Sequence, residues 1–141
     1  MKYVLDANVG LKWLLPEADS DKALRIRDDD RRQVHDLIAP DIFPVEVAHS
    51  LTRAERQNRI TPAESQAHFR DMLATLPMLH PYLPLLPRAY ELSSRARIGV
   101  YDCLYVALTE REGCDLLTAD ARLVNSLQPV YSFITSLASL P

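Results

Sequence analysis

The order of short apolar runs and longer helical patterns constrains this chain more than any other feature. Short runs at 3–5, 37–39 and 116–118 are each separated from the next by segments with helical periodicity. Such runs are typical of buried strands, and strands that alternate with helices form a parallel sheet covered on both faces. The sequence therefore predicts an α/β fold, with ligands bound beyond the carboxyl ends of the strands.

Caps and breakers place the remaining elements. Thr61, Pro62 and Glu64 form a capping box that opens a helix, and Gly99 and Gly113 are expected to end two others. Pro16 is expected to end the first helix. We expect helices at 9–15, 21–32, 41–57, 61–76, 88–98, 102–112 and 120–127, and weaker strands at 78–80 and 130–133.

Size and composition favour one small domain. The 141 residues are 48% hydrophobic, enough for a core, so we expect a single domain over 1–141. The net charge of −3 excludes a strongly basic surface that would bind nucleic acid by charge alone. The two cysteines form no close metal-binding pair. The sequence has neither a long apolar run nor a signal-peptide pattern, so we expect a cytoplasmic protein.

Two aspartates follow predicted strands. Asp6 comes directly after the run at 3–5, and Asp120 follows the run at 116–118. Both are at the strand ends where functional groups gather in parallel sheets, although each also suits a helix N-cap. Asn8 and Thr118 lie two residues from them and are candidates for positioning a ligand.

Two further carboxylates fall near helix N-termini. Asp102 opens the predicted helix at 102–112, where capping is the simplest alternative role. Glu46 lies early in the helix at 41–57, opposite its apolar stripe of Val47, Leu51 and Ala54. Taken alone, Glu46 also suits an ordinary solvated surface position.

As a set, the four carboxylates indicate a metal site. In a parallel sheet, strand carboxyl ends and the N-termini of the following helices share one edge, so the four are expected to converge. Converging carboxylates repel and need a compensating cation, and Mg²⁺ or Mn²⁺ prefers oxygen ligands. An ion held there can activate water for phosphodiester hydrolysis.

Three segments resemble the PIN-domain family, notably the VapC-type toxins of toxin–antitoxin pairs. These are YVLDANVGLKWLLPE at 3–17, APDIFPVEVAHSL at 39–51 and GVYDCLYVALTEREGCDLLTAD at 99–120. The resemblance covers essentially the whole chain. It implies a three-layer α/β/α fold with a mostly parallel sheet of about five strands.

The resemblance also implies a function. It suggests a Mg²⁺- or Mn²⁺-dependent endoribonuclease, forming a homodimer and neutralised by a cognate antitoxin. The metal-site role is carried onto Asp6, Glu46, Asp102 and Asp120, with Asn8 and Thr118 as supporting polar residues. His49 departs from the family's pattern, which has a small amide there, and we expect it to be a surface histidine.

Several neighbouring residues carry structural expectations. We expect Asp41 to cap its helix and Asp115 to lie at the sheet edge away from the site. Tyr101 is expected to pack beneath the site, with base stacking as the alternative. Lys12 is within reach of the site's edge, with no role assigned. Arginine clusters at 53–59 and 88–97 are candidates for phosphate contacts, although any single arginine more often has a surface role.

Three other functions compete with the nuclease. A phosphatase with an aspartate nucleophile needs Asp-x-Asp, whereas the chain has Asp6-Ala7-Asn8. A receiver module needs an adjacent acidic pair after the first strand and a lysine after the last, and the chain has neither. A catalytically weak PIN-like scaffold or RNA-binding module, acting through partner binding, is the remaining alternative, which the complete acidic set disfavours.

Overall fold

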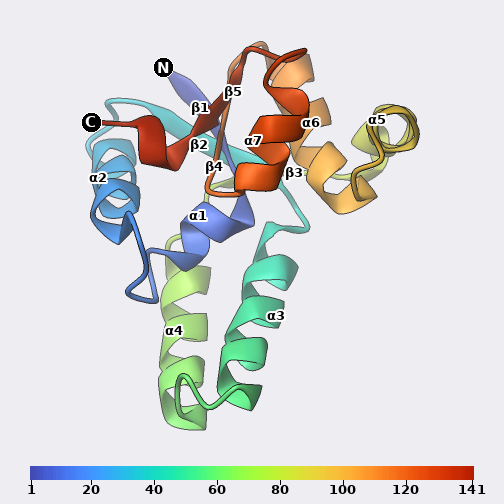
Figure 1. The fold of residues 1–141 in the computed structure, drawn as a ribbon. Helices are drawn as coiled ribbons and strands as arrows, with labels where there is room; N and C mark the ends of the chain where they lie inside the picture. Colours follow the sequence, from blue (N-terminus) through green and yellow to red (C-terminus); the bar gives the residue numbers. More distant parts are fainter.

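The protein folds around one parallel sheet. The computed structural model describes residues 1–141. All strand pairs are parallel, in the order β3-β2-β1-β4-β5 (Figure 1). The strands are β1 (Lys2–Leu5), β2 (Asp36–Pro40), β3 (Met78–His80), β4 (Asp115–Thr118) and β5 (Ile134–Ser136).

The strand order fixes where a ligand can bind. From β1 the chain builds outward through β2 to β3, and it then crosses back to place β4 on the other side of β1. Leu5 pairs with Leu117, so β1 and β4 end side by side. This reversal of direction opens a crevice at the carboxyl ends of β1 and β4, the usual ligand position in such sheets.

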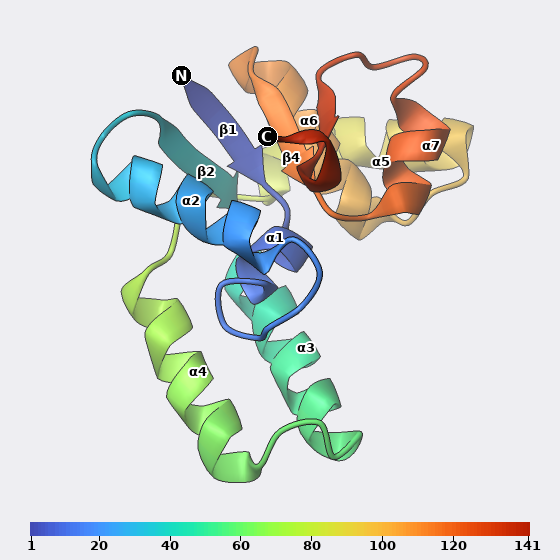
Figure 2. The same ribbon diagram turned by 60° about the vertical axis from the view of Figure 1, so that its left-hand side comes forward.

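Seven α-helices and two short 3₁₀ helices surround the sheet. α6 packs against β1, β2 and β4, and α5 packs on α6, whereas α2 lies on the opposite face (Figure 2). The helices are α1 (Ala7–Leu11), α2 (Ser20–Arg31), α3 (Phe43–Arg56), α4 (Pro62–Ala74), α5 (Leu86–Ala96), α6 (Val100–Glu112) and α7 (Ala121–Leu127), with η1 (Leu83–Leu85) and η2 (Leu137–Ser139). No helix has the length and apolar character needed to cross a membrane.

The core is centred on α6 and the middle strands. Every α6 residue from Cys103 to Thr109 is buried, as are Val4 and Leu5 of β1. A helix that is buried all round carries no clear apolar stripe, which explains why its sequence reads as nearly continuous apolar residues. The α/β/α layering expected from the sequence is confirmed, and the sheet is entirely parallel.

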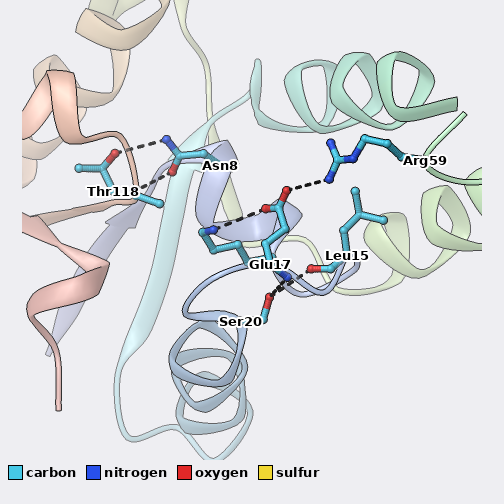
Figure 3. Close-up of polar contacts among 8 residues, drawn as sticks. Asn8, Leu15, Glu17, Ser20, Arg59 and Thr118 are labelled. Atoms are coloured by element: carbon cyan, nitrogen blue, oxygen red, sulfur yellow. Dashed lines mark hydrogen bonds and ion pairs between the residues drawn. The ribbon is translucent and has the colours of Figure 1, made fainter. Parts of the chain in front are cut away.

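The antiparallel pair α3 and α4 projects away from the sheet (Figure 1). The predicted capping box is present: the Thr61 side chain accepts from Glu64 N, and the Glu64 carboxylate accepts from Thr61 N. Glu17 ties the tip of this pair to the turn that follows α1, because its carboxylate meets Lys12 Nζ at 3.5 Å and Arg59 Nη2 at 3.3 Å (Figure 3). The projection is therefore held by both packing and charge.

Two element boundaries predicted from the sequence are wrong. The last strand is 134–136 rather than 130–133, because Tyr131 and Phe133 pack on the core and on each other, with ring centroids 5.5 Å apart. The first helix covers 7–11 rather than 9–15. Beyond it, Lys12 N and Trp13 N bond three residues back, so the helical pattern continues as tight turns.

Two predicted helix ends are also corrected. Arg97, at φ 58°, ends α5 in the left-handed conformation, whereas Gly99 is extended and precedes the first residue of α6. Gly113 ends α6 at φ 62°, as predicted. Asp41 is not the cap of α3, since Ile42 holds that position and Asp41 Oδ1 instead accepts from Tyr82 N at 3.0 Å.

Gly10 marks the closest approach between α1 and α3. A Cβ atom there would lie 2.5 Å from Cζ of Phe43, which is 1% exposed and part of the core. We expect Gly10→Ala to lower the free energy of unfolding by about 1–3 kcal/mol, the usual cost of overpacking a core. Chemical denaturation measures it. Gly99→Ser is the control, because nothing lies within 4 Å of a Cβ there. Equal stability of Gly10→Ala and the native protein would contradict the packing.

Candidate active site

Asp6 is placed by the sheet itself. Its backbone N donates to Leu117 O at 3.0 Å, which continues the pairing of β1 with β4 by one residue. Asp6 is 5% exposed and occupies the N-cap position of α1, but its side chain makes no capping bond there. Instead its Oδ2 accepts from Thr118 Oγ1 at 2.9 Å and from Asn8 Nδ2 at 3.3 Å. The Asp6 carboxylate is therefore fixed at the crevice.

Thr118 and Asn8 connect the ends of the two central strands. Thr118 is fully buried, and its Oγ1 accepts from Asp120 N at 3.1 Å while donating to Asp6. Asn8 Nδ2 lies 3.4 Å from the same hydroxyl, and Asn8 Oδ1 accepts from Ala119 N at 3.0 Å (Figure 3). The structure thus brings both predicted supporting residues against Asp6.

Glu46, a residue of α3, lines the same cavity as Asp6. Its Oε1 accepts a 2.7 Å hydrogen bond from the hydroxyl of Tyr105, a residue of α6 that is fully buried. Glu46 is half-buried, so it is not the solvated surface residue that the helix pattern also allowed. Sequence reasoning missed Tyr105. The available signal was a phenol within a buried apolar helix, since a buried hydroxyl needs a partner.

Asp102 lines the same cavity as Asp6 and Glu46. It lies in the first turn of α6, and Gly99 holds the N-cap position, so the capping role suggested by the sequence is wrong. A cavity of about 580 Å³ contains Asp6, Glu46 and Asp102 in its walls. Asn8, His49 and Tyr101 line it too. The sequence predicted that four carboxylates converge at this edge, and three of them line this cavity.

Tyr101 stands at the rim of this cavity. It is 61% exposed and directly precedes Asp102, so it does not pack beneath the site as expected from the sequence.

Asp120 has a different position from the other three. Its Oδ1 accepts from Arg122 N at 2.9 Å and from Leu123 N at 3.4 Å, which makes it the N-cap of α7. It does not line the cavity, although its negative charge raises the pKa of both Asp6 and Asp102. Asp120 is thus a structural cap that also contributes to the electrostatics of the site.

Burial and mutual repulsion raise the pKa values of the three cavity carboxylates. Burial is the largest cause for Asp6, and with its acidic neighbours, Asp102 above all, it raises the pKa to about 7. The pKa values of Glu46 and Asp102 are raised too, again chiefly by burial. Hydrogen bonds from Thr118 to Asp6 and from Tyr105 to Glu46 act in the opposite direction. The site therefore holds more negative charge than its surroundings neutralise.

The chemistry of these donors fits a hard divalent cation. No three Asp, Glu, His or Cys side chains are arranged closely enough to hold an ion by themselves. Mg²⁺ normally uses only one or two protein carboxylates and completes its coordination with waters and substrate phosphates. The carboxylate oxygens and the uncompensated charge of Asp6, Glu46 and Asp102 match that requirement.

Lys12 and several members of the two arginine clusters are already paired with glutamates. Lys12 and Arg59 both bind Glu17, and Arg88 binds Glu110 with an Nε–Oε1 distance of 2.7 Å. Arg95 contacts Glu91 at 3.0 Å. Arg122, by contrast, lowers the pKa of Asp102 through its positive charge. Members of both arginine clusters therefore have structural ion pairs.

Comparison with known proteins identifies the family. A profile of the PIN domain matches residues 3–125, and the chain belongs to this family. Ribonuclease VapC3 of Pyrobaculum aerophilum is 31% identical over 87% of this chain and 92% of its own length. Ribonuclease VapC9 of Mycobacterium tuberculosis H37Rv is 29% identical, over 82% of this chain and 91% of the relative.

Solved structures show the same fold. The crystal structure of PAE2754 from Pyrobaculum aerophilum aligns with a TM-score of 0.70, covering 99% of this chain and 94% of that one, at 19% identity. VapBC2 from Rickettsia felis, bound to a DNA fragment from its promoter, aligns with a TM-score of 0.67 and 13% identity over 96% of this chain and 98% of that one. The predicted PIN-like fold is confirmed.

The raised pKa of Asp6 predicts a pH dependence of stability. Because the folded protein binds this proton more tightly than the unfolded chain, the contribution of Asp6 to stability is greatest below its ordinary pKa of 3.8. It is lost as the pH rises through about 7. In EDTA, we expect Asp6→Asn to gain stability relative to the native protein over this range, by at most about 4 kcal/mol.

Urea unfolding of both proteins at pH 4 and pH 8 measures this difference. Asp115→Asn is the control, because Asp115 is an exposed residue at the opposite end of β4. A stability difference between Asp6→Asn and the native protein that stays constant with pH would contradict the raised pKa.

Proposed function

We propose that this protein is a divalent-metal-dependent endoribonuclease of the VapC type, acting as the toxin of a toxin–antitoxin pair. The observation that carries the proposal is the meeting of Asp6, Glu46 and Asp102 in one cavity at the carboxyl ends of β1 and β4. Membership of the PIN-domain family and relatives named VapC ribonucleases support the same activity.

Each residue of the site has a role that follows from its contacts. Asp6 and Asp102 would hold Mg²⁺ or Mn²⁺, with Glu46 on the facing wall of the cavity. Thr118 and Asn8 keep the Asp6 carboxylate oriented, and Tyr105 does the same for Glu46. The bound ion would activate water and stabilise the leaving oxygen of a phosphodiester.

The acidic walls of the cavity set a condition for RNA binding. Phosphate groups are repelled by bare carboxylates, so RNA binding at this cavity depends on a cation between the two. A scaffold that only binds a partner would have no need to bury Asp6 beside two half-buried carboxylates, which costs stability. The acidic set therefore favours catalysis over the scaffold alternative.

Cleavage of RNA tests the catalytic site directly. We expect the purified protein to cleave structured RNA with Mg²⁺ or Mn²⁺ and not with EDTA, and Asp6→Asn and Asp102→Asn to lose about 100-fold or more in rate, as expected when an ion's ligand is lost. Gel analysis of end-labelled RNA measures the rates.

The matched control is Asp115→Asn, which changes an exposed aspartate at the far end of β4 and is expected to cleave at the native rate. Cleavage that persists in EDTA, or in both Asp6→Asn and Asp102→Asn, would overturn the mechanism.

The toxin role is tested in cells. We expect expression of the native chain to arrest growth, expression of Asp102→Asn to leave growth unaffected, and co-expression of the antitoxin, encoded by the neighbouring gene, to rescue the native strain. Growth curves measure all three. Arrest by Asp102→Asn that equals the native effect would contradict toxicity through RNA cleavage. The homodimer implied by the family stays a prediction.

A further inference from the structure

A basic cavity, lined by Arg27, Arg31 and His68, lies between α2, α4 and the turn that follows α1 (Figure 2). Its volume is about 320 Å³, and none of its lining residues also lines the acidic cavity. The two arginines come from α2, and the histidine comes from the facing helix α4. Positive charge therefore gathers at one place in a protein whose net charge is −3.

The cations of the basic cavity are not neutralised by neighbouring carboxylates. No ion pair joins Arg27, Arg31 or His68 to any acidic side chain, although the aspartates at 28–30 lie between the two arginines in the sequence. Arg27 and Arg31 are four residues apart, so they share one face of α2 and repel each other. An anion bound between them would remove this repulsion.

The guanidinium of Arg27 is positioned by Trp13. Trp13 Nε1 donates to Ala23 O at 2.9 Å, which fixes the indole against α2, and the guanidinium carbon of Arg27 lies 6.0 Å from the indole centroid. Nε of Arg27 is buried and has no hydrogen-bond partner. Because an unpartnered buried donor costs stability, this edge of the guanidinium favours a ligand that supplies an acceptor.

The arrangement of donors selects a phosphate group. The planar fork of an arginine binds two oxygens of a phosphate or a carboxylate, and here a second arginine and an imidazole approach from other directions. A carboxylate presents two oxygens in one plane, whereas the tetrahedral phosphate can accept from both helices at once. The one carboxylate in the wall, that of Asp71, is exposed and weakens the positive field without cancelling the charge of two arginines.

We propose that the basic cavity is a phosphate-binding site separate from the acidic cavity. It takes one phosphate group, with Arg27 and Arg31 donating from α2 and His68 donating from α4. The phosphate group belongs either to free phosphate or to the backbone of an RNA strand. In the second case the inference rests on the proposed ribonuclease function and adds a substrate contact outside the cleavage site. A phosphate in the acidic cavity needs a cation, whereas one in the basic cavity needs none.

Trp13 provides a direct readout, because it is the only tryptophan of the chain and lines the basic cavity. Inorganic phosphate is titrated into the native protein in EDTA, and the indole N–H signal is followed by NMR spectroscopy. Without a metal ion the acidic cavity repels phosphate, so a saturable shift reports the basic cavity. We expect Arg31→Gln and Arg27→Lys each to raise the dissociation constant about tenfold, the effect of a lost charge-assisted hydrogen bond.

Two further variants separate local contacts from general charge. Arg70→Gln removes a positive charge from an exposed α4 residue that does not line the cavity, and it is expected to keep the native dissociation constant. Asp71→Asn removes the carboxylate of the wall and is expected to tighten phosphate binding about two- to fivefold, the range of an exposed charge interaction. Arg31 and Asp71 are both exposed, so these two variants decide the test even if Arg27→Lys fails to fold.

A second probe identifies the source of the phosphate. It is a 12-nucleotide single-stranded RNA, added in EDTA to the non-cleaving Asp6→Asn protein. An RNA-induced shift of the indole signal at lower concentration than with inorganic phosphate, lost in Arg31→Gln, assigns the site to RNA. A shift with inorganic phosphate alone assigns it to free phosphate. No shift with either probe, an equal loss in Arg70→Gln, or a shift with a polyglutamate peptide and not with phosphate would overturn the site.

Failure of the ribonuclease proposal is distinguishable from failure of the phosphate site. If the native protein cleaves no RNA but inorganic phosphate shifts the indole signal as expected, only the catalytic proposal fails. If metal-dependent cleavage is present and neither probe shifts the signal, only the phosphate site fails.

Discussion

A negative charge buried at the end of β1 is the constraint on which the rest of the structure depends. The Asp6 carboxylate is 5% exposed and has three acidic neighbours whose charges reach it. Such a group is costly in the folded state unless hydrogen bonds and a cation offset its charge. The buried hydroxyl of Thr118 and the amide of Asn8 supply the bonds, and the open crevice leaves room for the ion.

Helix α6 holds the opposite side of this arrangement rigid. Its middle residues are buried on all sides, so it has little freedom to move relative to β1 and β4. Asp102 projects from its first turn into the cavity, and Tyr105, one turn later, bonds Glu46 of α3. Helix α6 therefore positions two of the three carboxylates. Asp102 is one of its own residues, and Glu46 is held by the hydrogen bond from Tyr105.

The division between a charged and an apolar cavity gives the site its chemical character. The acidic cavity suits a cation and a phosphate, while an adjoining cavity, which shares Val45 and Tyr101 with it, offers mostly apolar walls and no positive charge. Many basic side chains of this protein neutralise glutamates on the surface instead of facing the site, as Arg59 and Arg88 do. Under the proposed function, substrate binding therefore depends on a bound cation more than on a basic surface.

The sequence by itself determined the α/β class, most of the strands and helices, and the three cavity carboxylates with Asn8 and Thr118, because periodicity and strand-end positions are local properties of the chain. The sequence prediction misplaced β5. The aromatic residues at 131 and 133 suggested a strand, but in the structure their side chains pack against the core. The sequence already allowed the N-cap role of Asp120, which is a local contact, whereas only the tertiary structure revealed the Tyr105–Glu46 bond and the exposure of Tyr101. Those depend on which side chains meet across elements distant in sequence, and no local pattern encodes that meeting.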